Sequence, residues 1–138
     1  MNNLVIVPIG SFEEHGPHLP PETDYLIAKK IVHEISLIFK GKRIKGVNIG
    51  ISPEHMSFKT TKSITEREFI ALIEEFIKKF QNNSKFIVIN AHGGNNRALN
   101  SIQKKFKKKN VSYKHLFNYK RRNKTIKNFK NGGHLSCR

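Results

Sequence analysis

GSFEEHGPHLPPETD, residues 10–24, follows a short apolar run and precedes a pattern typical of a helix. These fifteen residues hold two histidines, four carboxylates, two glycines and three prolines. A loop that only turned the chain would need neither the histidines nor so many acids, whereas a loop that holds a divalent metal ion would need both. The stretch therefore predicts a strand–loop–helix unit whose loop carries chemistry.

The segments on either side of this loop set the expected fold. Residues 4–9 are apolar, largely β-branched and followed by Gly10, which is typical of a buried strand. Thr23 or Asp24 can cap the helix that follows, which is expected to end at Gly41. The spacing predicts that this helix turns one apolar stripe inward, formed by Leu26, Ile27, Ile31, Ile35 and Ile38.

The rest of the chain repeats the alternation of strand and helix. Thr65 and Glu68 form a capping box at the start of the next helix. The predicted elements are a strand with Val47, Ile49 and Ile51, a helix over 65–82, a strand over 86–89, a helix over 96–109 with Leu99, Ile102 and Phe106 inward, and a strand over 111–119. This order predicts an α/β fold in which helices cover the faces of a mainly parallel sheet.

Three polar loops, 10–24, 52–60 and 90–96, each follow a predicted strand. Because the carboxyl ends of parallel strands lie at one edge of a sheet, these loops are expected to meet in a single site. Glu13 and His15 are two residues apart and would leave an extended segment on the same side. Asp24 and His92 would join them from a helix start and another strand end, and Gly93 and Gly94 would let the backbone approach closely.

Mixed histidine and carboxylate ligands suit Zn, Mn or Fe. Each of these features alone is also typical of a solvated turn, so a plain loop stays the alternative.

The motifs resemble those of a known family. VPIGS at 7–11, EEHGPHLP at 13–20 and TD at 23–24 resemble the signature of the creatininase family, and GISPEH at 50–55 and NAHGGN at 90–95 match its next motifs in order. The resemblance implies a three-layer α/β/α fold and a metal-dependent amidohydrolase, often hexameric, that hydrolyses C–N bonds outside peptides, in a cyclic amide or a formamide. An alternative within the family is the archaeal-type formamidopyrimidine-nucleotide deformylase of flavin and deazaflavin synthesis.

The resemblance also implies roles for individual residues. The ligands of one or two metal ions, with Asp24 as the bridge, would be Glu13, His15, Asp24 and His92. The residues that line the substrate pocket would be His55, Gly93, Gly94 and Asn95. His134 would transfer a proton to the leaving nitrogen.

Two departures from the family pattern matter. Phe58-Lys59-Thr60-Thr61 stands where the family usually has Phe-Pro-Gly-Thr, and Gly94 stands where creatinine hydrolases have a glutamate. Gly94 therefore favours the deformylase over creatinine hydrolysis. Relatives with Gly-Gly recruit a later glutamate, but no acid follows Glu75 in this chain. We therefore interpret residues 1–119 as an incomplete, truncated hydrolase domain, and a single-metal site or an inactive remnant are the alternatives.

Charge is distributed unevenly over the 138 residues. The net charge is +16, and residues 76–138 hold seventeen Lys and Arg and no acid. We interpret this surplus mainly as solvated surface and residues 120–138 as a basic, poorly ordered tail; a nucleic-acid-binding module over 104–130 is the alternative.

With one cysteine and no run of about 18 apolar residues, the chain is expected to be cytoplasmic, without a membrane partner. A small-molecule substrate and a homo-oligomer are the expected partners.

Overall fold

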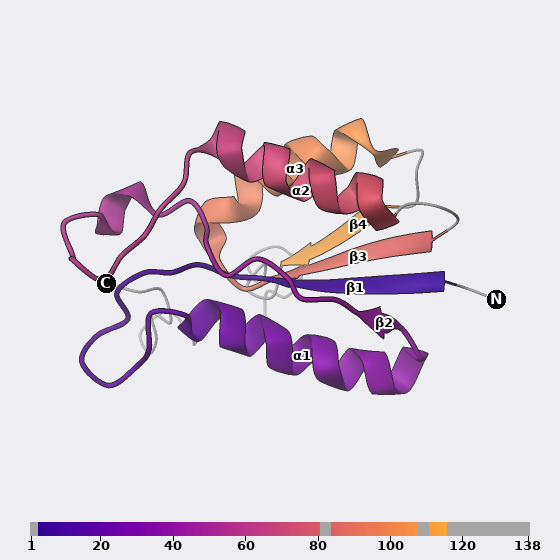
Figure 1. The fold of residues 1–138 in the computed structure, drawn as a ribbon, viewed down its shortest axis with the longest axis horizontal. Helices are drawn as coiled ribbons and strands as arrows, with labels where there is room; N and C mark the ends of the chain where they lie inside the picture. Colours follow the sequence, from indigo (N-terminus) through magenta and orange to yellow (C-terminus); the bar gives the residue numbers. More distant parts are fainter. Residues whose placement is uncertain (1–2, 81–83, 108–110, 116–138) are drawn as a thin grey trace, which may run out of the picture.

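The computed structural model describes residues 3–80, 84–107 and 111–115 (Figure 1). Its strands, helices and 3-10 helices (η) are, in chain order, β1 (Asn3–Ile9), α1 (Thr23–Phe39), β2 (Lys42–Arg43), η1 (Pro53–His55), α2 (Glu66–Phe80), β3 (Ser84–Asn90), η2 (Gly93–Asn95), α3 (Asn96–Lys105) and β4 (Val111–His115). No helix within these ranges is long and apolar enough to cross a membrane.

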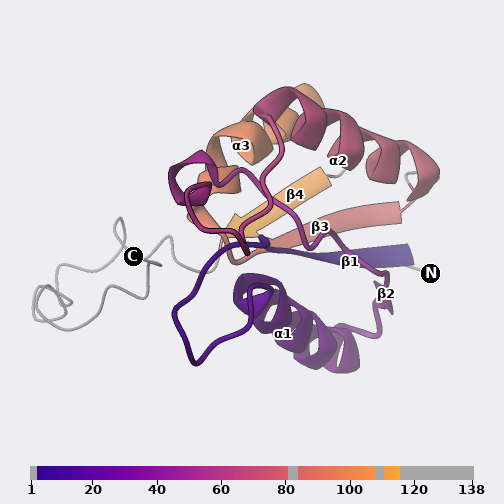
Figure 2. The ribbon, with the colours of Figure 1, turned by 60° about the vertical axis from the view of Figure 1, so that its left-hand side comes forward.

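The sheet has the order β2-β1-β3-β4, and all its paired strands are parallel. Helix α1 covers one face, and α2 and α3 cover the other (Figures 1 and 2). This arrangement confirms the predicted three-layer α/β/α architecture with a parallel sheet. It also confirms the strands predicted over 4–9 and 86–89, which are neighbours in register from Asn3–Ser84 to Ile9–Asn90.

The central strand β1 contributes to a hydrophobic core on each face of the sheet. Val5, Val7 and Ile9 pack with residues of α2 and α3, whereas Ile6 packs with Ala28 and other residues on the α1 side. Successive side chains of a strand point to opposite faces, so a strand covered on both faces is apolar throughout. This burial explains the continuous apolar run in β1.

The predicted inward stripe of α1 is wrong in its register. The buried residues of this helix are Asp24, Ala28, Val32 and Ser36. Of the predicted stripe, Ile31 and Ile35 are half-buried, while Leu26, Ile27 and Ile38 are exposed. The observed face has a spacing of four residues that begins at Asp24, and its small side chains let the helix lie close to the sheet.

The predicted cap of α1 is also wrong. The N-cap residue is Glu22, which makes no side-chain capping bond. The Thr23 hydroxyl donates instead to the Pro20 carbonyl at 2.6 Å. The Asp24 carboxylate accepts from the Ser11 hydroxyl at 3.0 Å and faces two histidines. Both candidate caps are therefore engaged outside the helix.

The strand predicted around Val47, Ile49 and Ile51 is wrong as well. The strand beside β1 is β2, and Val47 forms only an isolated bridge with Ile9. After Val47 the chain leaves the sheet, and the Gly50 carbonyl accepts from the Ile64 amide at 3.0 Å. This pairing carries residues 50–52 toward the strand ends instead of along β1.

The later elements follow the predictions more closely. Helix α2 has the predicted capping box, in which the Glu68 amide donates to the Thr65 hydroxyl oxygen at 3.2 Å and the Thr65 amide donates to the Glu68 carboxylate at 2.7 Å. Helix α3 ends at Lys105 and buries Leu99 and Ile102 as expected, and Phe106, which follows its last residue, is buried too. Residues 116–119 and the predicted tail over 120–138 lie outside the described residues.

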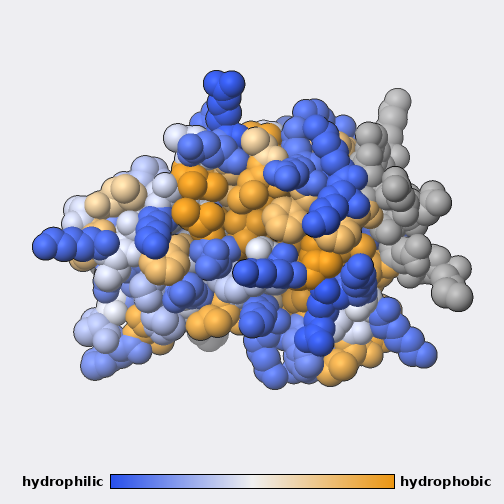
Figure 3. Space-filling view, in the orientation of Figure 1, coloured by the Kyte–Doolittle hydropathy of each residue, from blue (hydrophilic) through white to orange (hydrophobic). Residues whose placement is uncertain are grey.

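Hydrophilic side chains project over much of the face seen in Figure 3, around an apolar strip. Of the segment proposed to bind nucleic acid, only residues 104–107 and 111–115 are described.

The capping box generates a prediction about stability. Thr65→Ala should lower the free energy of unfolding by about 1 kcal/mol, because the Glu68 amide loses its capping acceptor. Thr65→Ser keeps the hydroxyl and should stay close to the wild type. Urea unfolding followed by circular dichroism measures both values. Equal losses for the two variants would contradict a capping role of the hydroxyl.

The same box generates a pH dependence. Hydrogen bonds from the backbone and the hydroxyl of Thr65 lower the pKa of Glu68 below its ordinary value of 4.5. The Glu68 carboxylate therefore contributes stability above that value, and this contribution is lost as the pH falls through the lowered folded-state pKa. The difference in stability between the wild type and Glu68→Gln should be smaller at about pH 3 than at about pH 7. A difference that is constant across this range would contradict the assignment.

Candidate metal centre

The site forms where the loops after β1, β3 and residue 50 meet at the carboxyl edge of the sheet (Figure 1). Gly10 ends β1 against the first turn of α1, where a Cβ atom would lie 2.2 Å from the Tyr25 nitrogen. Only glycine allows this approach. The close contact brings Asp24, at the start of α1, to the strand ends.

The carboxylate of Asp24 is shared between two histidines. Its Oδ1 atom lies 3.1 Å from Nε2 of His15, and its Oδ2 atom lies 3.1 Å from Nδ1 of His92. Glu13 joins from the same loop, with Oε1 3.2 Å from Nδ1 of His92. Glu13, Asp24 and His92 are buried, with exposed fractions of 1%, 7% and 6%. The structure therefore brings together all four predicted metal ligands.

Backbone carbonyl groups fix the orientation of both imidazole rings. Nδ1 of His15 lies 2.8 Å from the Glu13 carbonyl oxygen, and Nε2 of His92 lies 2.9 Å from the Ile51 carbonyl oxygen. A carbonyl oxygen only accepts, so each of these nitrogens carries the hydrogen. The opposite nitrogen of each ring faces carboxylate oxygens. Such an arrangement is the usual way in which proteins orient a histidine toward a metal ion.

The electrostatics of the cluster favour cations. Burial lowers the pKa of His92, but hydrogen bonds with Asp24 and Glu13 outweigh it and raise this pKa to about 10. For His15, burial is likewise outweighed by the hydrogen bond with Asp24, and the pKa lies above 6.5. Burial would raise the pKa of Asp24, but the two histidines hold it well below 3.8. Because imidazole binds a metal ion only when neutral, a proton and a metal ion compete for this cluster.

Three further side chains orient the cluster, and the sequence reasoning did not identify them. The Ser11 hydroxyl donates to Asp24, and the Ser52 hydroxyl lies 3.1 Å from Nε2 of His92. Asn90 holds the His92 backbone on both sides, since its Nδ2 atom donates to the carbonyl at 2.8 Å and its Oδ1 atom accepts from the amide at 3.2 Å. Ser11 lies just after β1, Asn90 is the last residue of β3, and Ser52 lies in the loop after residue 50. All three belong to the quoted motifs, and that position is the signal that could have found them.

The four predicted pocket residues differ in their surroundings. His55 has Nε2 3.9 Å from Oε2 of Glu13 and is half-buried. Asn95 is fully buried, and its amide group bonds to the backbone of Gly10 and Ile51. It therefore ties the loops together from inside the fold. Contact of these residues with a substrate stays a prediction.

The two adjacent glycines are not equivalent. A Cβ atom on Gly94 would lie 2.1 Å from the Ile51 carbonyl oxygen and 2.5 Å from Nε2 of His92, whereas one on Gly93 would meet nothing within 4 Å. The backbone at Gly94 therefore excludes a side chain where creatinine hydrolases carry a glutamate. Both glycines are exposed at the site.

Among the described residues, two groups of three side chains place one ligand atom each within 4.8 Å of one another. One group is Glu13, Asp24 and His92, and all three are buried. The other consists of Glu13, Glu54 and His55 and is partly exposed. Neither contains His15, which faces the second oxygen of Asp24. His134, the predicted proton donor, lies outside the described residues.

The chain resembles known proteins over most of its length. A family model described as "Creatininase: Creatinine amidohydrolase" matches residues 1–134. A mycofactocin precursor peptide peptidase from Mycolicibacterium smegmatis is 35% identical over 103 residues, which are 70% of this chain and 42% of that protein. The 2-amino-5-formylamino-6-ribosylaminopyrimidin-4(3H)-one 5'-monophosphate deformylase from Methanobrevibacter ruminantium is 33% identical over 105 residues, 69% of this chain and 42% of that protein. This chain thus matches less than half the length of either relative.

Solved structures share the fold. A structure described as "Creatininase Mn" superposes with a TM-score of 0.72 at 15% identity and covers 83% of this chain and 51% of that chain. A mutant creatininase of the Zn-Zn type superposes with a TM-score of 0.70 at 15% identity and covers 97% and 58% of the two chains. These matches confirm the creatininase-like fold that the sequence motifs predict.

The different surroundings of Gly93 and Gly94 generate a prediction about stability, for which the Gly93 variant is the control. Gly94→Ala should lower the free energy of unfolding by about 1–3 kcal/mol, because the new methyl group overlaps the Ile51 carbonyl and the His92 ring. Gly93→Ala should change it by less than about 0.5 kcal/mol. Thermal and urea unfolding of the two variants measure the difference. Equal effects would contradict the close approach of the backbone at Gly94.

Proposed function

This chain belongs to the creatininase family, and we propose that Glu13, Asp24 and His92 hold a divalent metal ion that serves the hydrolysis of an amide-type C–N bond. One observation carries the proposal. The ligand atoms of these three buried side chains lie within 4.8 Å of one another, although they come from a loop, a helix start and a strand end. Buried carboxylates are rare unless they are paired or coordinate metal ions.

The donor set fits such an ion. One imidazole and two carboxylates leave a coordination position open, as in catalytic zinc sites. The same donors suit manganese. Solved creatininases of matching fold are described as Mn and Zn-Zn forms, which supports either metal here. His15, on the second oxygen of Asp24, would serve a second ion, and iron stays a further candidate.

A divalent cation bound at such a site polarises a carbonyl group and lowers the pKa of a coordinated water. The protein residues prepare the site for it. Glu13 and Asp24 supply negative charge, and the Ile51 carbonyl keeps the metal-facing nitrogen of His92 directed at both. Burial strengthens these electrostatic interactions. His55, half-buried beside Glu13, would contact the substrate. His134 would return a proton to the leaving nitrogen.

The substrate class we propose is a small molecule with a formamide or cyclic amide group. The resemblance to the deformylase supports a formamide. The exclusion of a side chain at Gly94 supports it further, because creatinine hydrolases use a glutamate at that position. The peptidase relative makes peptide hydrolysis the alternative to test. We also expect a homo-oligomer in the cytoplasm, which size-exclusion chromatography with light scattering and cell fractionation would test.

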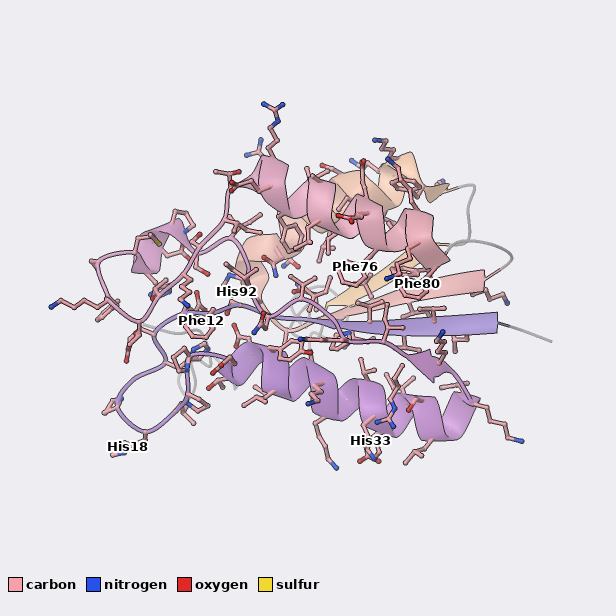
Figure 4. All side chains as sticks on the ribbon, in the orientation of Figure 1. Phe12, His18, His33, Phe76, Phe80 and His92 are labelled. Atoms are coloured by element: carbon pink, nitrogen blue, oxygen red, sulfur yellow. The ribbon has the colours of Figure 1, made fainter. Side chains whose placement is uncertain are left out.

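Metal analysis tests the proposal directly. The purified chain should bind Zn or Mn stoichiometrically, as measured by elemental analysis and by titration calorimetry. Glu13→Gln, Asp24→Asn and His92→Gln should each weaken binding by more than about 100-fold, since losing an outer-shell partner alone costs about 10–100-fold. His18→Gln is the matched control, because His18 lies exposed at the tip of the same loop, away from the cluster (Figure 4).

A folded chain that binds no divalent metal would contradict the proposal, as would a loss in the His18 variant equal to that in the ligand variants. Metal-loaded protein should also release formate from a formamide, and activity should disappear with a chelator and return with the metal. If the protein cleaved peptides of a test panel and not formamides, the proposed substrate class would be wrong, but the proposed metal centre would stand.

A further inference from the structure

The loop that carries Glu13 and His15 is joined to a second loop beside the site. The Lys62 amide donates to the Phe12 carbonyl at 2.8 Å, and Phe12 lies where the two loops meet (Figure 4). Two residues later, the Glu14 amide donates to the Thr61 hydroxyl at 3.0 Å. Thr61 is buried. These bonds join the backbone of the loop that carries Glu13 and His15 to residues 50 and 47 positions away.

The side chain of Glu14 extends this connection. Its Oε2 atom accepts from the Thr60 hydroxyl at 2.5 Å, and its Oε1 atom accepts from the Gly16 amide at 3.0 Å. One oxygen therefore holds the neighbouring loop, and the other holds the next turn of its own loop. We call Glu14, Thr60 and Thr61 the Glu14 clasp.

Glu14 lies between Glu13 and His15, which both face the proposed metal site, so the clasp acts on the backbone between these two residues. Successive side chains of an extended segment leave in opposite directions, so Glu13 and His15 turn toward the cluster while Glu14 turns away. Two different anchors hold Glu14 from that outer side. A displacement of its backbone would move the residues before and after it together. The Glu13 backbone is also held within the loop, because its amide donates to the Pro21 carbonyl at 3.1 Å and its carbonyl accepts from Nδ1 of His15 at 2.8 Å.

Hydrogen bonds to charged groups contribute more to stability than bonds between neutral groups. The Thr60 hydroxyl donates to a carboxylate, so this bond is of the stronger kind. The Thr61 hydroxyl accepts from a backbone amide, which fixes the peptide itself. The clasp thus limits both the rotation of the Glu14 side chain and the movement of the backbone between the two site residues.

We propose that Glu14, held by Thr60 and Thr61, is a positioning residue that sets the separation and orientation of Glu13 and His15 and thereby tunes metal affinity and geometry. The role rests on the proposed metal-binding function. Glu14 does not itself reach the metal, because both its oxygens are engaged on the outer side of the loop. Thr60 and Thr61 act through it.

Metal affinity and a ligand-field spectrum test this role. Glu14→Ala should weaken Zn²⁺ binding about 10–100-fold, the usual cost of losing an outer-shell partner, and Thr60→Val should weaken it about tenfold. Thr60→Ser keeps the hydroxyl and should therefore bind Zn²⁺ with an affinity close to that of the wild type, since the outer-shell partner is retained. In Co²⁺-loaded protein, the visible absorption bands should shift in Glu14→Ala and Thr60→Val but not in Thr60→Ser.

Ser101→Ala is the control, since it removes an exposed hydroxyl that donates to the Arg97 carbonyl within α3. It should change neither the affinity nor the spectrum. Unchanged Zn²⁺ affinity and Co²⁺ spectrum in Glu14→Ala and Thr60→Val would overturn the positioning role and leave the metal site intact. Equal losses in Thr60→Val and Thr60→Ser would also overturn it. A wild type that binds neither ion would overturn this role and the proposed function together.

Discussion

The structure depends on the carboxylate of Asp24, which is shared by two histidines that come from different strand ends. One oxygen faces His15 in the loop after β1, and the other faces His92 after β3, each at 3.1 Å. A buried carboxylate is costly unless positive charge compensates it. The same contacts that satisfy this charge also hold α1 against the ends of two neighbouring strands. Fold and site are therefore stabilised by one interaction.

The need to keep Asp24 at the site explains which residues of α1 face the sheet. Asp24 must face inward at the helix start, so the residues four, eight and twelve positions later, Ala28, Val32 and Ser36, face inward with it. Larger apolar residues are left outside, among them Leu37 and Ile38 with exposed fractions of 64% and 72%. As a result, α1 leaves large apolar side chains exposed to solvent, while the Asp24 carboxylate stays at the site. Small inward residues also permit the close packing that the site geometry needs.

The sequence predicts features that arise from local patterns. The apolar runs of β1 and β3, the capping box at Thr65 and the ligand motifs are readable because each depends on residues a few positions apart. The register of α1 is not readable in this way, because apolar residues lie on more than one of its faces. The Glu14 clasp escapes prediction for another reason. It joins residues 46 and 47 positions apart, and such contacts leave no periodic signal.

The central claim is that an imidazole and two carboxylates hold a metal ion at the carboxyl edge of the sheet. X-ray absorption at the zinc edge of the Zn-loaded chain tests it most directly. The account predicts a first shell of nitrogen and oxygen atoms at about 2.0–2.2 Å, with the outer-shell scattering of imidazole, and a decrease of that scattering in His92→Gln. A first shell with sulfur at about 2.3 Å, or one of oxygen atoms without imidazole, would contradict it.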